Sequence, residues 1–90
     1  MNITTIEEVR AYIEDMTDET VSIFDNYDYA TAFIGLSLDN RAVYDFDLMV
    51  IHLMEKENWD VTDAMEWISY NTIRSLPYME NSPIIITTVD

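Results

Sequence analysis

Residues 30–56, ATAFIGLSLDNRAVYDFDLMVIHLMEK, decide the fold of this chain. Two apolar runs, over residues 30–38 and 42–44, are separated by Asp39-Asn40, and both of these residues tolerate turn and left-handed conformations. The stretch therefore predicts a β-hairpin with its turn at Asp39-Asn40. A helical turn from Tyr29 to Phe33, ahead of the first strand, is an alternative that the sequence leaves open.

The residues after the hairpin predict a helix that runs to about Lys56. Either Asp45 or Asp47 caps its start, because a carboxylate there accepts hydrogen bonds from the free N–H groups of the first turn. Apolar side chains nearly surround this helix, so we expect it to be heavily buried. These side chains are Leu48, Met49, Ile51, Leu53 and Met54.

The segment before the hairpin predicts one helix and one short strand. Apolar residues recur at helical spacing from about Thr5 to Met16, and Thr5 with Glu8 forms a capping-box pattern. Val21 and Ile23 alternate with polar neighbours, which is typical of a strand.

The segment after residue 56 predicts a third helix and a last strand. Asp60 begins the helix with Asp63 at its third position, and Leu76-Pro77 ends it, because the residue before a proline is pushed out of the helical region. Its inner stripe consists of Val61, Ala64, Met65, Ile68 and either Thr72 or Ile73. Residues 84–89, IIITTV, predict a buried strand.

Together these elements predict one domain over residues 1–90 with an α+β fold. Three helices pack on a small, mostly antiparallel sheet, and the helices, the hairpin and the last strand follow in the order α-β-β-α-α-β. No apolar run approaches the ~20 residues of a membrane span, and the first residues do not have the pattern of a secretory signal. The chain has no cysteine, so we expect a protein of a reducing, cytoplasmic compartment, with no role at a membrane.

The charge of the chain is its strongest functional signal. It has 18 Asp and Glu against four Lys and Arg, a formal net charge of −14, yet 49% of its residues are hydrophobic, too many for a disordered acidic tail. Binding phosphates takes several cationic side chains, so direct binding of nucleic acid is excluded. An excess of acid attracts a cationic partner instead.

The sequence contains no motif for catalysis or for a cofactor. There is no cysteine and no serine in a nucleophile-elbow context, and the single glycine excludes phosphate-binding loops. A calcium loop starting at Asp45 would need glycine and glutamate at its sixth and twelfth positions, which are Val50 and Lys56. We therefore expect a protein that is not an enzyme and binds neither a metal nor a cofactor.

Acids near the hairpin and the helix starts are the candidate partner-binding residues. Evenly spread over roughly 5,500 Å² of surface, 18 carboxylates would give one per ~300 Å², against one per ~110 Å² on duplex DNA. Resemblance to nucleic acid therefore needs the acids gathered on one face. The alternative is that each of them only caps a turn or helix. The candidates are Asp25, Asp28, Asp39, Asp45, Asp47, Asp60, Asp63 and Glu66.

Residues 70–79, YNTIRSLPYM, form a second candidate surface. Tyr, Met and Arg are enriched at interface cores, so Tyr70 and Tyr78 could contact a partner. The alternative is structural, with Arg74 paired to an acid such as Asp45 and the tyrosines covering the edge of the core. A homodimer through an aromatic and methionine patch is a rival function, and its residues would be Trp59, Trp67, Tyr70, Tyr78 and Met79.

Three stretches carry a resemblance to a known group of proteins: VYDFDLMVIHLM at 43–54, DAMEWISYNTIRSLPYM at 63–79 and PIII at 83–86. They resemble a family of small acidic proteins of bacteriophages and prophages, which share a Tyr-Asp-x-Asp run and a YNTIR-x-LPY element. The resemblance covers roughly residues 30–88, implies a phage origin and brings no assigned activity. In composition the chain is also similar to phage anti-CRISPR and anti-restriction proteins.

The leading hypothesis is a phage-encoded inhibitor of a host defence protein, such as a CRISPR effector or a restriction nuclease. Its acidic face would mimic nucleic acid and occupy the basic groove of that protein in the bacterial cytoplasm. The rival is the homodimeric interaction or assembly module. A third hypothesis is a regulator that senses a small molecule or a cation.

Overall fold

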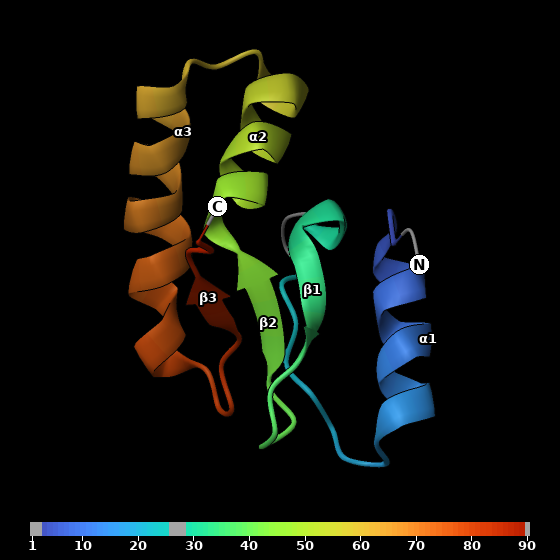
Figure 1. Ribbon diagram of the computed structural model, residues 1–90. Coiled ribbons are helices and arrows are strands. Elements are labelled where there is room, and N and C mark those ends of the chain that lie inside the picture. Colours follow the sequence, from blue (N-terminus) through green and yellow to red (C-terminus); the bar gives the residue numbers. More distant parts are fainter. Residues whose placement is uncertain (1–2, 26–28, 90) are drawn as a thin grey trace.

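The computed structural model describes residues 3–25 and 29–89, and it has the predicted α+β fold with three α-helices and a three-stranded sheet (Figure 1). The element order α-β-β-α-α-β is confirmed. The elements are α1 (Ile6–Met16), a 3-10 turn η1 (Ala30–Ala32), β1 (Phe33–Leu36), β2 (Ala42–Asp45), α2 (Phe46–Glu57), α3 (Val61–Trp67), a π-helical turn η2 (Ile68–Thr72), a 3-10 helix η3 (Ile73–Tyr78) and β3 (Ile84–Ile86).

The predicted hairpin is formed by β1 and β2, which pair antiparallel. Its turn is closed by the hydrogen bond from the Ser37 N–H to the Arg41 carbonyl, 2.8 Å long, and Asn40 adopts a left-handed φ of 59°. The 3-10 turn η1 precedes β1, so the alternative of a helical turn ahead of the first strand is correct. A bulge between Phe33 and Gly35 interrupts the register of the pair.

The third strand makes the sheet mixed, because β3 pairs parallel with the central strand β2. A parallel pair needs a crossover connection, and α2 with α3 provides it. We predicted a buried strand over residues 84–89, but β3 ends at Ile86, opposite Asp45. The chain of β2 turns into α2 directly after Asp45, so the prediction was wrong because Thr87 has no partner strand beside it.

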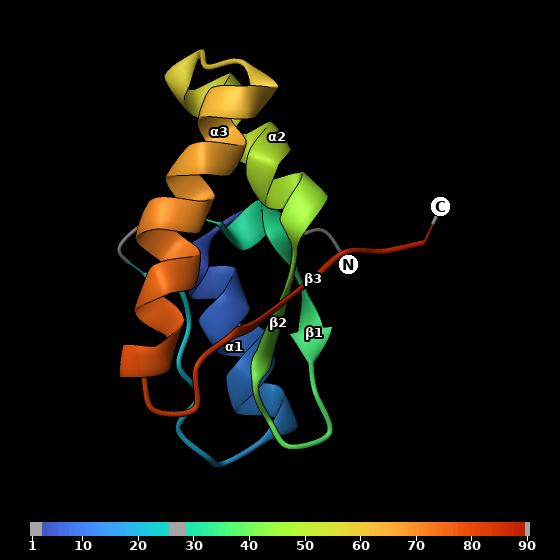
Figure 2. The ribbon, with the colours of Figure 1, turned by 90° about the vertical axis from the view of Figure 1, so that its left-hand side faces the viewer.

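The core lies between one face of the sheet and the helices. In Figure 2 the sheet is seen nearly edge-on, with α1 and α3 on the same side of it. The core side chains come from α1, the hairpin and both later helices, among them Val9, Ile13, Phe33, Tyr44, Met49, Leu53, Ala64 and Ile68.

Residues 20–24 form no strand, so the strand predicted from Val21 and Ile23 is wrong. The segment instead runs along the core as an irregular chain. Ile23 and Phe24 are both buried, and the backbone N–H of Phe24 donates to the hydroxyl of Tyr44 at 3.3 Å. The alternation of apolar and polar residues around Val21 and Ile23 therefore reflects side chains that pack on the core, and it does not indicate a strand.

The helix caps agree with the sequence. Thr5 caps α1 through the N–H of Glu8, and Glu8 Oε1 accepts from the N–H and hydroxyl of Thr4 and from the hydroxyl of Thr5. These bonds, led by those to Thr4, lower the pKa of Glu8 from its usual 4.5. Asp45 caps α2 and Asp60 caps α3, each through a side-chain oxygen.

Both later helices are less buried than predicted. α2 buries Met49, Val50 and Leu53, whereas Leu48 and Ile51 are 38% and 48% exposed. The prediction of a nearly surrounded helix was wrong, because the described elements cover only one side of α2. In α3 and its extension, Ala64, Ile68 and Thr72 are buried, while Val61, Met65 and Ile73 remain exposed.

The third helical rod also ends later than predicted. It passes Pro77 and ends at Tyr78, because it changes from α through the π-helical turn η2 to the 3-10 helix η3. Pro77 lies inside η3, in the last helical turn. None of the helices in the described part of the chain is long and apolar enough to cross a membrane.

Candidate functional site

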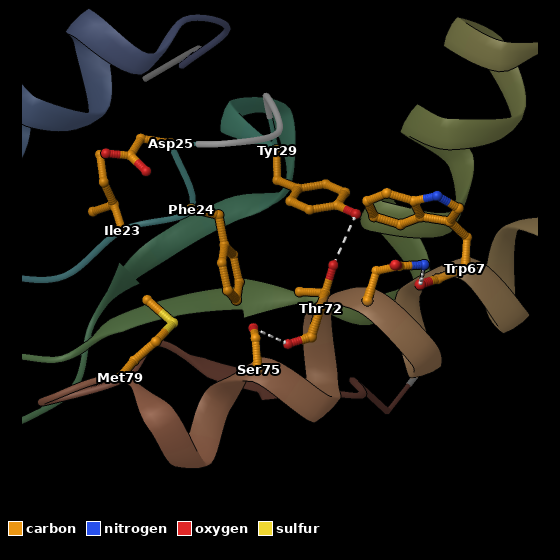
Figure 3. A pocket seen from close by; sticks show the side chains of 9 residues that line it. Ile23, Phe24, Asp25, Tyr29, Trp67, Thr72, Ser75 and Met79 are labelled. Carbon is orange, nitrogen blue, oxygen red and sulfur yellow. Dashed lines mark hydrogen bonds between the residues drawn. The ribbon is translucent and has the colours of Figure 1, made fainter.

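One pocket lies between the third helical rod and the side chains of residues 23–25 and Tyr29. It has a volume of about 320 Å³ (Figure 3). One wall is made by Ile23, Phe24, Asp25 and Tyr29, and the other by Trp67, Asn71, Thr72, Ser75 and Met79.

The π-helical turn η2 shapes the second wall. In this turn the N–H of Ile73 donates to the carbonyl of Ile68, five residues back. The side-chain amide of Asn71 donates to the carbonyl of Trp67 at 3.0 Å. π-Turns add one residue to a helix and are frequent at functional sites.

A hydrogen bond connects the two walls. The hydroxyls of Tyr29 and Thr72 lie 3.3 Å apart, and both residues are buried. Burial raises the pKa of Tyr29 above its usual 10.0, so this phenol stays protonated at neutral pH. The hydroxyl of Ser75 donates to the carbonyl of Thr72 at 2.6 Å. The hydroxyl and amide groups of the pocket are therefore engaged in hydrogen bonds within the fold.

A second, shallower pocket of about 320 Å³ adjoins the first and shares Trp67 and Asn71 with it. Its other lining residues are Trp59, Asp63, Glu66 and Tyr70. The ring centroids of Trp59 and Trp67 are 6.4 Å apart and their planes are tilted by 41°. We call this second site the aromatic pocket.

The residues of the YNTIRSLPYM segment divide between several roles. Tyr70 lines the aromatic pocket, and the guanidinium of Arg74 lies 5.8 Å from the centre of the Tyr70 ring. Met79 lines the first pocket, whereas Tyr78 is 90% exposed and lines neither of the two.

Asp45 is not a surface charge. It is only 7% exposed, one carboxylate oxygen accepts from the N–H of Leu48 at 3.2 Å, and the other accepts from the hydroxyl of Thr88 at 3.3 Å. The expected pairing of Arg74 with Asp45 is therefore wrong, because capping of α2 and Thr88 occupy the carboxylate. Asp45 is also unsuited to the partner-binding role predicted for it.

The structure brings together only part of the predicted acidic set. Asp63 and Glu66 meet Tyr70 at the aromatic pocket, and Asp25 lies at the first pocket, where it also pairs with Arg10 at 3.5 Å. Asp60 is exposed and caps α3. Asp47 is exposed in the first turn of α2, and Asp28 lies outside the described residues.

The remaining predicted acid, Asp39, lies in the loop between β1 and β2, at the end of the molecule opposite the α2–α3 connection. Figure 1 shows the tip of the β1–β2 hairpin at one end and the connection between α2 and α3 at the other. The side-chain amide of Asn40 donates to Glu19 at 3.1 Å, so residues 17–20 lie beside the hairpin tip. The predicted acids that the structure describes therefore do not form one cluster.

Eight of the 15 exposed acids in the described part of the chain belong to segments at the two ends. We define the hairpin-end acids as those from the end of α1 to residue 19 and in the hairpin loop, Asp15, Asp18, Glu19 and Asp39. The connection-end acids are those from the end of α2 to the start of α3, Glu55, Glu57, Asp60 and Asp63. Within residues 3–25 and 29–89, no three acids or histidines are placed to hold a metal ion. The sequence prediction did not include five of these eight acids, Asp15, Asp18, Glu19, Glu55 and Glu57, although the acidic run at 18–19 was a signal for two of them.

The walls of the first pocket were also missed. They come from residues 23–25, Tyr29 and residues 67–79, which are far apart in the chain, so no local pattern could indicate their contact. Comparison of the chain with protein-family models, with curated proteins and with solved structures found no match.

Proposed function

We propose that this chain is a non-enzymatic, phage-encoded inhibitor that occupies the basic groove of a host nucleic-acid-binding defence protein. The observation that carries the proposal is the exposure of its acids. Of the 16 described Asp and Glu residues, 15 are exposed, and Asp45 is the exception. Such a surface attracts a cationic partner, and the association is fast and sensitive to salt.

The four Lys and Arg residues of the chain cannot neutralise its 18 acids, and the three arginines also make contacts within the fold. Arg41 is used inside the fold, because its guanidinium donates to the carbonyl and the hydroxyl of Ser82 at 2.8 and 3.2 Å. Arg74 lies over the ring of Tyr70, and Arg10 pairs with Asp25.

The density and spacing of the acids indicate how such a surface would work. Fifteen exposed carboxylates on 6003 Å² amount to one per 400 Å², well below the one per ~110 Å² of duplex DNA. The mimicry would therefore be local, at the hairpin-end and connection-end acids. The molecule is 38 Å long, close to the ~34 Å of one duplex turn, so the two ends could meet cationic sites one turn apart.

The test is capture of a partner followed by competition with nucleic acid. The chain is immobilised and exposed to nuclease-treated bacterial lysate at about 50 mM and about 500 mM NaCl. We expect a nucleic-acid-binding protein that is retained at low salt and released at high salt. The free chain should then displace a labelled duplex or RNA from that purified protein.

Two charge-reversal pairs locate the contact. Asp15→Lys with Asp18→Lys changes the hairpin end, and Glu55→Lys with Glu57→Lys changes the connection end by the same net charge. Loss of competition in either pair supports the proposal. A partner that stays bound to the chain at high salt and still binds its nucleic acid would contradict the proposal. A dimer of the chain that persists at high salt would favour the rival function of a homodimeric interaction module.

A further inference from the structure

We propose that the aromatic pocket receives the guanidinium group of one arginine side chain of the partner protein. The inference rests on the proposed function, because it names the chemical group that a cationic partner would insert. It follows from three independent features of the pocket: its aromatic rings, its carboxylates and the arginine already stacked at its edge.

The rings provide the first feature. Trp59, Trp67 and Tyr70 gather at a cavity of about 320 Å³, and Trp59 and Trp67 are close enough to hold a planar group beside both indoles. A cation over the face of an aromatic ring is attracted by the negative potential of that face, most strongly for tryptophan. Tyr70 is 66% exposed and leaves the pocket open to a side chain from outside.

The carboxylates provide the second feature. Asp63 and Glu66 line the same pocket, one helical turn apart on α3, and both are exposed. No lysine or arginine stands among the described residues that line it. A guanidinium presents several N–H donors in a rigid plane, so it can stack on a ring and donate to a carboxylate at once, whereas an ammonium acts as a point charge.

Arg74 provides the third feature. Its guanidinium carbon lies 5.8 Å from the centre of the Tyr70 ring, one turn further along the same helical rod. The fold thus already stacks an arginine on one of the three rings. An arginine from outside would find the same kind of contact in the aromatic pocket, where Tyr70 is joined by two indoles and two carboxylates.

The two tryptophans make the pocket directly observable. They are the only tryptophans of the chain, so both indole N–H resonances in a nitrogen–proton NMR spectrum report on this site. The probes are N-acetyl-arginine amide, N-acetyl-lysine amide and the citrulline analogue, which keeps the shape of arginine without its charge. They are titrated to about 50 mM at constant ionic strength, because one side chain binds weakly.

We expect saturable shifts of both indole resonances with the arginine probe, weaker binding of the lysine probe and no saturable binding of the citrulline probe. Glu66→Gln should weaken the arginine probe about three-fold, the size of one exposed charge-assisted contact. The matched control Glu55→Gln removes the same charge on α2, at a residue that does not line the pocket, and should leave the affinity unchanged.

Equal binding of arginine and citrulline, equal binding of arginine and lysine, or equal weakening by Glu66→Gln and Glu55→Gln would overturn the inference. These titrations use no partner protein. Their failure would therefore reject the arginine pocket alone, whereas failure of the capture experiment would reject the proposed function and leave the pocket chemistry intact.

Discussion

At the scale of single residues, Asp45 illustrates how burial changes the meaning of an acid. Its position beside the hairpin and at a helix start made it a candidate for partner binding, but its two oxygens accept hydrogen bonds from the N–H of Leu48 and the hydroxyl of Thr88. The carboxylate thereby joins the start of α2 to the chain after β3. Asp45 therefore contributes to the stability of the fold and not to a binding surface.

Replacement of this residue provides a direct test. Asp45→Ala should lower the free energy of unfolding by about 1–2 kcal/mol, because it removes the N-cap of α2 and leaves the Thr88 hydroxyl without its acceptor. The measurement is urea unfolding followed by circular dichroism. Asp47→Ala, at an exposed position of the same helical turn, should cost at most about 0.5 kcal/mol, and equal effects of the two changes would contradict the assignment.

At the scale of the elements, the sequence predicts what depends on neighbouring residues and misses what depends on distant ones. The Thr5–Glu8 box, the caps at Asp45 and Asp60 and the turn at Asn40 are local, and all of them are present. The length of β3 depends instead on where β2 ends. The π-helical turn was equally hidden, because the inner stripe fits either Thr72 or Ile73 on an α-helix.

The candidate site also combines residues that are close in the chain with residues that are distant in it. Asp63, Glu66 and Tyr70 lie on one helical rod, but from the sequence alone we assigned the two acids and Tyr70 to separate candidate surfaces, and only the structure shows that all three line the aromatic pocket. The first pocket needs Tyr29 to meet Thr72 across 43 residues, a contact that only the whole fold determines.

The contact between Tyr29 and Thr72 can be tested by a single substitution. Thr72→Val keeps the shape of the side chain but removes the hydroxyl that faces Tyr29, so it should cost about 1 kcal/mol of unfolding free energy. Thr62→Val, at an exposed position of α3, should change it by less than about 0.5 kcal/mol. If chemical denaturation gives both variants the wild-type value, the two walls of the pocket are not joined as described.

At the scale of the whole molecule, the net charge of −14 opposes the compact state through self-repulsion. Added salt screens this repulsion, so the melting temperature should rise between about 20 mM and about 500 mM NaCl. The variant with Asp15→Lys and Asp18→Lys has a net charge of −10, since each change adds two positive charges, and its melting temperature should rise less. Calorimetric scans that show the same salt response in both proteins would argue against uncompensated charge.

The central claim is that exposed carboxylates of this chain replace nucleic acid on a cationic protein surface. The most direct measurement is the association constant between the chain and its captured partner, determined by titration calorimetry at several NaCl concentrations. The account predicts a steep linear fall of log K with log salt, and a shallower slope after charge reversal of the hairpin-end or connection-end acids. An association constant that does not change with salt, or with those reversals, would contradict it.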